Sequence, residues 1–431
     1  MQRIGVIGAG YVGLVTAAVL ADLGNKVVCQ DSDLRKIKNL QKGIIPIYEP
    51  GLAKIVKKNI KAKRLSFTFN LPNLVNKSLV IFICVGTPSG KDGGADLSSV
   101  ENVTHRIAQS MKEYKIIVEK STVPVETGEW IRRTILMHNK CGIKFSIVSN
   151  PEFLREGSAL EDAFHPDRIV LGVEDERAEK VMRSLFKPIK APIVVTNIKT
   201  AEMIKHASNS FLATKISFIN AVARLCDKVG ADVTKVAEGM GLDKRIQRAF
   251  LNAGAGFGGS CFPKDLEAFI YLAKKSGYDF GLLKEVARIN KQQKQLLIKK
   301  IEEAVWIISG KTIGVLGLSF KPNTDDIRFS SSIDLIKMLQ SDGAKIKAYD
   351  PQAMPKAKKE LKNVKFCRDH YEVARNSDCL VIMTEWEQFR SMDLTRIKRL
   401  LRKPIIVDGR NIFQPKEMAR LGFTYKCFGR V

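Results

Sequence analysis

The stretch Arg3-Ile-Gly-Val-Ile-Gly8-Ala-Gly10-Tyr-Val-Gly13 decides the fold, because a short apolar run leads directly into three closely spaced glycines. Residues 3–7 predict a β-strand, and the apolar stretch Val12–Leu23 predicts a helix. A second strand is expected over Lys26–Gln30, and Asp31 follows it at once. The chain therefore begins with a βαβ unit of about 30 residues.

The glycine spacing in this unit indicates a dinucleotide-binding loop. Gly8 would allow a tight turn, Gly10 would let a pyrophosphate approach the backbone, and Gly13 would let the helix pack closely on the strand. Asp31 would accept hydrogen bonds from a ribose diol and repel a 2′-phosphate, so NAD is preferred to NADP. The motif alone leaves FAD open, and an ordinary glycine turn is the alternative. The strand, the helix and the acid in register favour the functional interpretation.

Short apolar runs alternate with helical patterns through the first 200 residues, which predicts a parallel α/β sheet. From about residue 200 the strand signals stop, and the stretches Thr200–Val229 and Leu282–Ile307 have helical periodicity. A glycine-rich loop lies between these two stretches. The apolar runs that predict further strands of the first sheet are 79–85, 116–119, 145–149 and 169–172.

The α/β pattern resumes at Lys311 and repeats the beginning of the chain. Residues 311–318 echo residues 2–9, and residues 343–350 echo residues 24–31. We therefore predict an α/β protein with two Rossmann-like, doubly wound parallel-sheet domains joined by a central helical domain. The expected boundaries are 1–199 for the NAD-binding domain, 200–308 for the helical domain and 309–431 for the second Rossmann-like domain.

Composition excludes several classes of protein. Of 431 residues, 45% are hydrophobic and 27% are charged, which is typical of globular proteins and not of disordered or collagen-like chains. No run approaches about 20 apolar residues, so we expect no membrane span. The eight cysteines form no C-x-x-C pair. We therefore expect no metal site, and free thiols in a reducing cytoplasm.

The formal net charge of +26 would attract polyanions, phosphorylated substrates or acidic membranes. The basic residues are spread along the chain, without the aromatic interleaving or zinc-finger spacing typical of nucleic-acid binding. Nucleic acid is therefore a weak alternative as a partner.

A second motif, Gly256-Phe-Gly-Gly-Ser-Cys261-Phe-Pro-Lys264-Asp265, has the residues of a nucleophile loop. A thiol near a helix N-terminus and a lysine has its thiolate favoured. Asp265 is close enough in sequence to act as a base or to orient a water. The alternatives are a structural thiol at Cys261 and a helix N-terminal charge pair at Asp265.

These two motifs and several further sequence motifs resemble those of the nucleotide-sugar dehydrogenases over nearly the whole chain. The sequence departs from the family at Glu126, where glycine is usual, and at Ala221, where glutamate is usual. The matching strings are Gly8–Gly13, Val85–Pro88 with Asp96-Leu97, Ser121–Pro124, Asn150–Gly157, Glu202–Asn209, Gly258–Asp265 and Phe320–Arg328.

The resemblance implies a four-electron oxidation, in which the C6 alcohol of the sugar becomes an aldehyde and then an acid while two NAD+ are reduced. Cys261 would add to the aldehyde, giving a thiohemiacetal that is oxidised to a thioester. Lys205 and Asn209 would donate to the oxygen at C6. In the remaining catalytic roles, Asp265 with a water placed by Thr122 would take the alcohol proton, and Glu156 would be the base for thioester hydrolysis.

The resemblance also implies binding residues and partners. The central helices would form a homodimer in which Arg245 reaches the neighbouring site, and the C-terminal domain would bind the UDP-sugar. Expected cofactor contacts are Gly8, Gly10, Tyr11, Val12, Gly13, Asp31, Lys36, Thr87, Thr122, Glu156, Lys264 and Arg328. Expected substrate contacts are Glu152, Phe153, Leu154, Arg155, Glu156, Lys205, Asn209, Arg245, Phe250, Leu251, Asn252, Ala253, Gly254, Gly258 and Lys321.

Three functions remain open from the sequence. The Lys205/Asn209 pair and the form of the Cys261 loop favour UDP-glucose as the substrate. GDP-mannose or a UDP-N-acetylhexosamine is the alternative within the same chemistry. A non-catalytic nucleotide-binding or polyanion-binding protein is the alternative from another class, and the intact Cys261, Lys264 and Asp265 argue against it.

Overall fold

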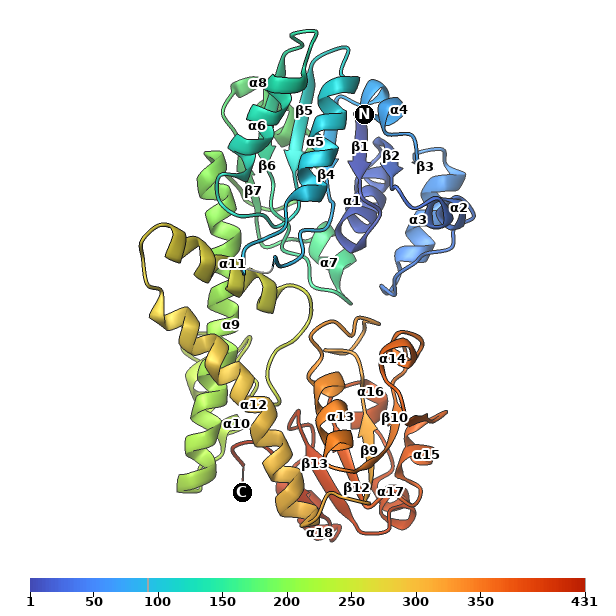
Figure 1. The fold of residues 1–431 in the computed structure, drawn as a ribbon, viewed down its shortest axis with the longest axis vertical. Coiled ribbons are helices and arrows are strands. Elements are labelled where there is room, and N and C mark those ends of the chain that lie inside the picture. Colours follow the sequence, from blue (N-terminus) through green and yellow to red (C-terminus); the bar gives the residue numbers. More distant parts are fainter. Residues whose placement is uncertain (91–92, 431) are drawn as a thin grey trace. The chain divides into compact units, whose positions relative to one another are not determined.

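The computed structural model describes residues 1–90 and 93–430, which form two compact units. The first unit contains Met1–Ser208 and Glu267–Gly277, and the second contains Asn209–Leu266 and Tyr278–Val431. Two helices, α9 (Ile198–Val229) and α11 (Phe262–Lys275), contribute residues to both units. Each unit has its own sheet (Figure 1).

The first unit is built on a sheet of eight strands in the order β3-β2-β1-β4-β5-β6-β7-β8. The order 3-2-1-4-5-6 of its first six strands is that of a doubly wound Rossmann sheet, which binds ligands where the order reverses, beside β1 and β4. The strands are β1 (Arg3–Ile7), β2 (Lys26–Gln30), β3 (Leu65–Thr68), β4 (Val80–Ile83), β5 (Lys115–Glu119), β6 (Phe145–Ser149), β7 (Ile169–Gly172) and β8 (Ile193–Thr196).

One edge of this sheet departs from the expected parallel arrangement. The pair Ser149↔Gly172 joins β6 and β7 in antiparallel fashion, whereas β7 and β8 are parallel to each other. The last two strands therefore run opposite to the first six. An apolar run predicts a strand but not its direction, so the sequence pattern does not reveal this edge.

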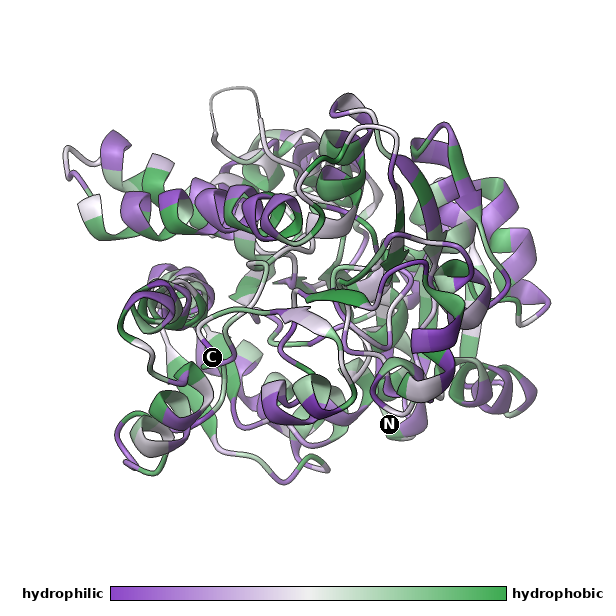
Figure 2. Cartoon of the chain, turned by 90° about the horizontal axis from the view of Figure 1, so that it is seen from below, coloured by the Kyte–Doolittle hydropathy of each residue, from purple (hydrophilic) through white to green (hydrophobic). Residues whose placement is uncertain are grey.

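Helices pack on the first sheet (Figure 1), and the helices of the chain carry both apolar (green) and polar (purple) residues (Figure 2). Helix α1 is apolar nearly all round, and nine of its twelve residues are therefore buried. The helices are α1 (Tyr11–Asp22), α2 (Leu34–Gln41), α3 (Leu52–Lys61), α4 (Leu71–Lys77), α5 (Ser98–Ser110), α6 (Thr127–His138), α7 (Ala159–Phe164) and α8 (Glu176–Phe186).

The second unit repeats this design. Its six strands have the order β11-β10-β9-β12-β13-β14 and are parallel throughout. The predicted echo of the N-terminal βαβ unit is thus confirmed at the level of sheet order. The strands are β9 (Thr312–Leu316), β10 (Lys345–Tyr349), β11 (Val364–Phe366), β12 (Cys379–Ile382), β13 (Ile405–Asp408) and β14 (Thr424–Lys426).

The predicted helical stretches correspond to α9 and to α12 (Gly281–Val305). The boundaries 1–199, 200–308 and 309–431 stay a prediction. Among the described residues, no helix is both long and apolar enough to cross a membrane. The other helices of the second unit are α10 (Val233–Gly241), α13 (Ser331–Ser341), α14 (Met354–Glu360), α15 (His370–Ala374), α16 (Glu387–Arg390), α17 (Leu394–Leu400) and α18 (Pro415–Arg420).

Candidate active site

The loop between β1 and α1 has the shape of a phosphate cradle. Gly8 has a φ of +99°, and a Cβ added at Gly13 would lie 1.8 Å from the carbonyl oxygen of Gly8. A Cβ added at Gly10 would meet nothing within 4 Å, so the backbone there borders open space. No side chain of the described residues caps the N-terminus of α1 at Gly10. These features fit a pyrophosphate approaching the free amides at the start of the helix.

Asp31 lies beside this cradle at the end of β2. Its carboxylate accepts hydrogen bonds from the Ala9 amide at 2.9 Å, the Asp33 amide at 3.0 Å and Lys36 Nζ at 2.8 Å. Burial alone would raise the pKa of Asp31, but Lys36 and the two amides outweigh it and the pKa is lowered. Asp31 is therefore an anion at neutral pH, as recognition of a ribose diol requires. Lys36, an expected cofactor contact, is its ion-pair partner.

Two further loops of the first unit carry predicted cofactor contacts. Thr87 Oγ1 donates to the carbonyl oxygen of Thr122 at 2.8 Å, and Ser121 Oγ donates to the carbonyl oxygen of Val85 at 2.7 Å. These bonds join the loops that follow β4 and β5. Both loops thus lie at the carboxyl ends of neighbouring strands, where doubly wound sheets bind ligands.

Tyr11 and Val12 lie in the first turn of α1. The hydroxyl of Tyr11 accepts from the Gly157 amide at 2.8 Å, and Glu49 accepts from the amides of Gly157 and Ala159 at 2.6 and 2.8 Å. These contacts join α1, through Tyr11, and the loop before α3, through Glu49, to the segment after β6. Glu49 was not predicted, because its partners are more than 100 residues away in sequence.

The segment after β6 contains a buried ion pair. Glu152 and Lys205 are 6% and 5% exposed, and Lys205 Nζ lies 3.2 Å from Glu152 Oε1. The other carboxylate oxygen of Glu152 accepts from the Leu154 amide at 2.5 Å, and Lys205 Nζ lies 5.2 Å from the ring of Phe153. Glu156 is also buried. Two predicted residues far apart in sequence are thus brought together.

Arg155, an expected substrate contact, has a different environment from Glu152 and Glu156. Its guanidinium is mostly exposed and pairs with Asp162. The predicted run 152–156 therefore contains both buried and solvent-facing side chains.

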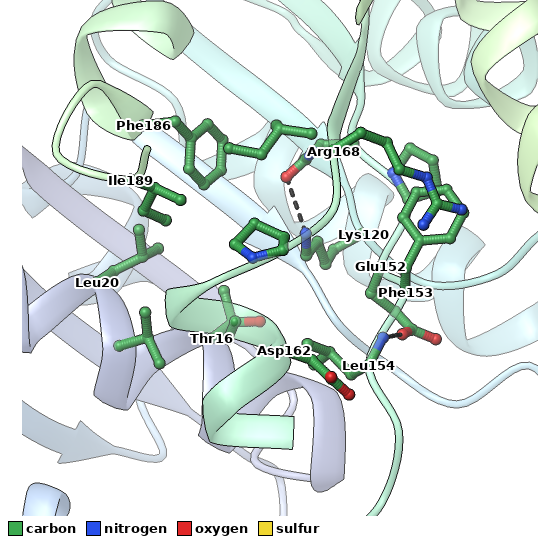
Figure 3. Close-up of a pocket in the computed structure, with 16 residues that line it drawn as sticks. Thr16, Leu20, Lys120, Glu152, Phe153, Leu154, Asp162, Arg168, Phe186 and Ile189 are labelled. Carbon is green, nitrogen blue, oxygen red and sulfur yellow. Dashed lines mark hydrogen bonds between the residues drawn. The ribbon is translucent and has the colours of Figure 1, made fainter. Parts of the chain in front are cut away.

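Residues 150–154 of this segment line a cavity of about 70 Å³ (Figure 3). Lys120 lines it and donates to Asn150 Oδ1 at 2.9 Å, and Arg168 stacks over the ring of Phe153 at 3.6 Å. Burial lowers the pKa of Lys120 to about 8. Lys120 was not predicted, although it directly follows the strand β5 and directly precedes Ser121.

The second unit holds the nucleophile loop. Cys261 is half-buried directly before α11, and its Sγ lies 3.9 Å from Ser260 Oγ. Asp265 is 1% exposed in the first turn of the helix. Its Oδ2 accepts from Asn209 Nδ2 at 2.6 Å, and its Oδ1 lies 3.4 Å from Lys264 Nζ. A thiol, a carboxylate, an amide and an ammonium group are therefore gathered at one helix N-terminus.

Lys205 and Asn209 are one turn apart along α9, as predicted, but they have different partners. Lys205 pairs with Glu152, whereas Asn209 donates to Asp265.

Side chains of α9 and α12 hold the expected substrate loop, residues 250–254, in place. The Gly254 amide donates to Asn220 Oδ1 at 2.9 Å, and its carbonyl oxygen accepts from Gln293 Nε2 at 3.0 Å. Phe250 adopts a φ of +67°. A Cβ added at Gly258 would lie 2.3 Å from the Phe329 carbonyl oxygen, so only glycine fits. The remaining members of the loop, Leu251, Asn252 and Ala253, lie between these fixed points.

Arg410 joins three loops near the carboxyl ends of the strands of the second sheet. Its guanidinium donates to the carbonyl oxygens of Met383, Gly256 and Phe320 at 2.7, 3.3 and 3.2 Å. Arg410 was not predicted, because its acceptors are up to 154 positions away in sequence.

Three predicted cationic contacts lie nearer the solvent. Arg328 is 59% exposed and pairs with Asp326 at 2.6 Å, and Arg245 is 88% exposed and pairs with Asp243 at 2.7 Å. Lys321 Nζ lies 5.8 Å from the ring of Phe320. Their predicted ligand contacts stay predictions.

The first unit has a Rossmann sheet with a glycine cradle and an ionised acid, which is the site of a dinucleotide. The second unit has a cysteine at a helix N-terminus, which is suited to covalent catalysis. Together these features define the class of NAD-dependent oxidoreductases. The comparisons agree with this class. The chain belongs to the UDP-glucose/GDP-mannose dehydrogenase family: residues 2–190 match its NAD binding domain, 199–292 its central domain and 314–415 its UDP binding domain. NAD is therefore the cofactor.

Individual relatives support the same assignment. The chain is 48% identical to UDP-glucose 6-dehydrogenase TuaD of Bacillus subtilis, over 100% of this chain and 94% of that protein. It is 40% identical to the UDP-glucose dehydrogenase structure from Pyrobaculum islandicum, with a TM-score of 0.93 and coverage of 99% and 97%. The UDP-D-ManNAc dehydrogenase structure from Pyrococcus horikoshii is 29% identical, with a TM-score of 0.89 and coverage of 100% and 99%.

Proposed function

We propose that this protein oxidises UDP-glucose at C6 to UDP-glucuronate, with two NAD+ reduced per sugar. The observation that carries the proposal is the group of Cys261, Asp265 and Asn209 at the start of α11. The full-length similarity to enzymes named for UDP-glucose supports the choice of sugar.

The first oxidation removes a proton from the C6 hydroxyl. Asp265, with a water near Thr122, takes this proton, and its buried carboxylate is suited to the task. Lys205 and Asn209 stabilise the negative charge that develops on the oxygen. Bound NAD+ supplies the hydride acceptor.

The second oxidation uses the thiol. Cys261 adds to the aldehyde carbon, which holds the intermediate in the site and prepares it for a second hydride loss. The resulting thioester is cleaved by water, with Glu156 as the base. Glu152, paired with Lys205, keeps that lysine in place between the two steps.

Substrate and cofactor contacts follow the predicted residues. The amides of residues 250–254 and Gly258 bind the sugar nucleotide together with Lys321. Lys264 and Arg328 contact the cofactor, with Lys36 and Asp31 at its ribose.

Another nucleotide sugar is the second candidate within the same chemistry. The structure from Pyrococcus horikoshii is named for UDP-D-ManNAc and superimposes well, but its identity of 29% is below the 40% of the UDP-glucose dehydrogenase structure. This difference favours UDP-glucose over an N-acetylated hexosamine.

The test is an NADH end-point assay with purified protein and a panel of UDP- and GDP-sugars. We expect UDP-glucose to be the best substrate, with two NADH per sugar and no free aldehyde. A stoichiometry near one NADH, or a clear preference for another sugar, would refute the proposal.

We propose that the functional form is a homodimer built on α9. Phe211, Phe218 and Leu225 are 65%, 50% and 58% exposed, and their seven-residue spacing puts them on one face of the helix. An apolar face of this kind is suited to a second copy of the chain. Arg245, which is 88% exposed, is then available to a neighbouring site.

We place the protein in the cytoplasm. The eight cysteines of the described chain are free thiols, and a reducing compartment keeps them so.

A further inference from the structure

Two buried glutamates lie side by side in the first unit. Glu119 ends β5 and Glu202 lies in the second turn of α9, and each is 2% exposed. Their carboxyl groups are hydrogen-bonded to each other. Two carboxylates cannot make such a bond, so one of the two groups holds a proton.

The partners of each group show which one holds the proton. Glu202 accepts from the Glu126 amide through Oε2 at 2.7 Å and from the Gly128 amide through Oε1 at 2.8 Å. Apart from the bond to Glu202, Glu119 Oε2 has no hydrogen-bond partner in the described part of the chain. Glu202 is therefore the carboxylate, and Glu119 is the neutral acid that donates to it. Burial and the neighbouring Glu202 raise the pKa of Glu119 well above its usual range, and burial also raises that of Glu202.

The amides that Glu202 binds belong to the loop that carries Thr122. Glu126 has a left-handed φ of +83° at the start of α6, in a conformation that glycine adopts more readily. The side chain of Glu202 compensates by fixing the backbone on both sides of Thr127. His206, one turn further along α9, binds the Val123 carbonyl oxygen at 2.7 Å. Helix α9 thus holds residues 123–128 through two neighbouring side chains.

We propose that Glu119 and Glu202, sharing one proton, are positioning residues that hold the 121–128 loop in its working conformation. The consequence for Thr122 rests on the proposed function, in which this threonine contacts the cofactor and a water. The same helix face continues to Lys205, so the pair also fixes the loop relative to that lysine.

Lys199 acts on Glu202 and pairs with Glu126 at 3.1 Å, and His206 faces the loop backbone. Loss of the shared proton at alkaline pH would put two carboxylates together in a buried site. We therefore expect the hydrogen bonds that hold the loop to Glu202 to weaken as the pH rises.

The experiment compares E119Q, which keeps a donor to Glu202 without needing a proton, with E119L, which removes the donor. The readout is the NAD+ dissociation constant, measured by calorimetry in the absence of sugar. We expect E119L to weaken NAD+ binding by about tenfold, the effect of one lost buried hydrogen bond. The NAD+ dissociation constant of E119Q should stay within about twofold of the wild-type value. It should also not rise at alkaline pH. E176Q, in an exposed ion pair on α8, is the matched control.

Infrared difference spectroscopy tests the proton directly. The spectrum of wild type minus E119Q should contain the C=O stretching band of a protonated carboxyl group, shifted in D2O. Absence of this band, or equal loss of NAD+ affinity in E119Q and E119L, would overturn the proposal. If E119L fails to fold, the band and the pH profile of E119Q still decide. If both behave as expected but wild type does not oxidise UDP-glucose, the proposed function fails and the acid pair stands.

Discussion

Among the cysteines, Cys261 is set apart by its surroundings rather than by its sequence neighbours alone. It is half-buried at a helix N-terminus, whereas Cys84 is buried, and burial raises the pKa of Cys84 to about 12. A thiol with so high a pKa is almost never a thiolate near neutral pH. The two residues are therefore a matched pair for testing the nucleophile.

We expect Cys261→Ser to lose net turnover by at least about a thousandfold while still binding UDP-glucose and NAD+. A hydroxyl is a far poorer nucleophile near neutral pH, and its ester is a worse substrate for hydrolysis than a thioester. Intact-protein mass spectrometry should detect any UDP-glucuronyl ester that accumulates. Cys84→Ser should lower the melting temperature and keep the chemistry. Near-normal turnover of C261S would exclude the covalent mechanism.

Asp31 supports a second prediction at this scale. Its carboxylate is lowered in pKa and lies beside the glycine cradle, so it repels a 2′-phosphate over the whole physiological range. We expect Asp31→Asn to narrow the NAD+/NADP+ ratio of kcat/KM by about tenfold. Lys36, released from its ion pair, is then free to meet the added phosphate. Equal kcat/KM values for the two cofactors in wild type would contradict this role.

Helix α9 combines several tasks in one element of 32 residues. Its first turns hold the 123–128 backbone through Glu202 and His206, and they present Lys205 and Asn209. Its later turns expose the apolar face of Phe211, Phe218 and Leu225. A continuous helix keeps these groups in fixed register, because each residue advances the axis by about 1.5 Å.

The apolar face leads to a prediction about assembly. We expect Phe218→Glu to convert a dimer into a monomer of 48.1 kDa, since a buried charge at the centre of the interface is strongly unfavourable. Light scattering after gel filtration measures the mass. Met137→Glu, on a 72% exposed residue of α6, is the control and should leave the mass unchanged. A wild-type mass of 48.1 kDa at micromolar concentration would refute the dimer.

The elements that the sequence predicted are those with strong local signals. Residues 3–7 and Lys26–Gln30 coincide with β1 and β2, because the glycines and Asp31 mark their ends. The strands β3, β8, β11 and β14 were not predicted. Polar or charged residues interrupt β3, β11 and β14, whereas the equally short β4 and β7 are continuous apolar runs and were predicted. The antiparallel direction of β7 relative to β6 could not be predicted either.

The candidate site shows the same limit. Gly8, Gly10 and Gly13 were predictable, because each has a steric reason that can be read locally. Glu49 and Arg410 were not, because they bind backbone groups 108 and 154 positions away. Side chains that hold loops together leave no short motif, since their partners are defined only by the fold.

The whole molecule carries a formal charge of +26, and both ligands of the proposed reaction are anions. A basic surface attracts such ligands, but salt screens this attraction over about 10 Å at 0.1 M. We expect KM for UDP-glucose to rise severalfold between low and moderate ionic strength while kcat changes little. A flat KM would mean that the lysines act only on solubility.

The second sheet has the strand order of the first six strands of the first sheet, yet the acids that follow the corresponding strands β2 and β10 have different surroundings. Asp31 follows β2 and binds two amides and Lys36. Asp350 follows β10, is fully buried and accepts from protein groups that include the amides of Leu318, Ser319 and Ala353. The same fold position therefore carries the proposed ribose-binding acid in the first unit and an acid that holds loop amides in the second.

The discontinuous first unit has a consequence for how the protein is made. Its last segment, Glu267–Gly277, is separated from Ser208 by residues that belong to the second unit. Translation proceeds from the N-terminus at roughly 5–20 residues per second. The nascent first unit therefore lacks part of its structure until residue 277 has left the ribosome. During that interval the emerging chain exposes surfaces that the finished protein covers, and this is the stage at which a molecular chaperone has most to protect.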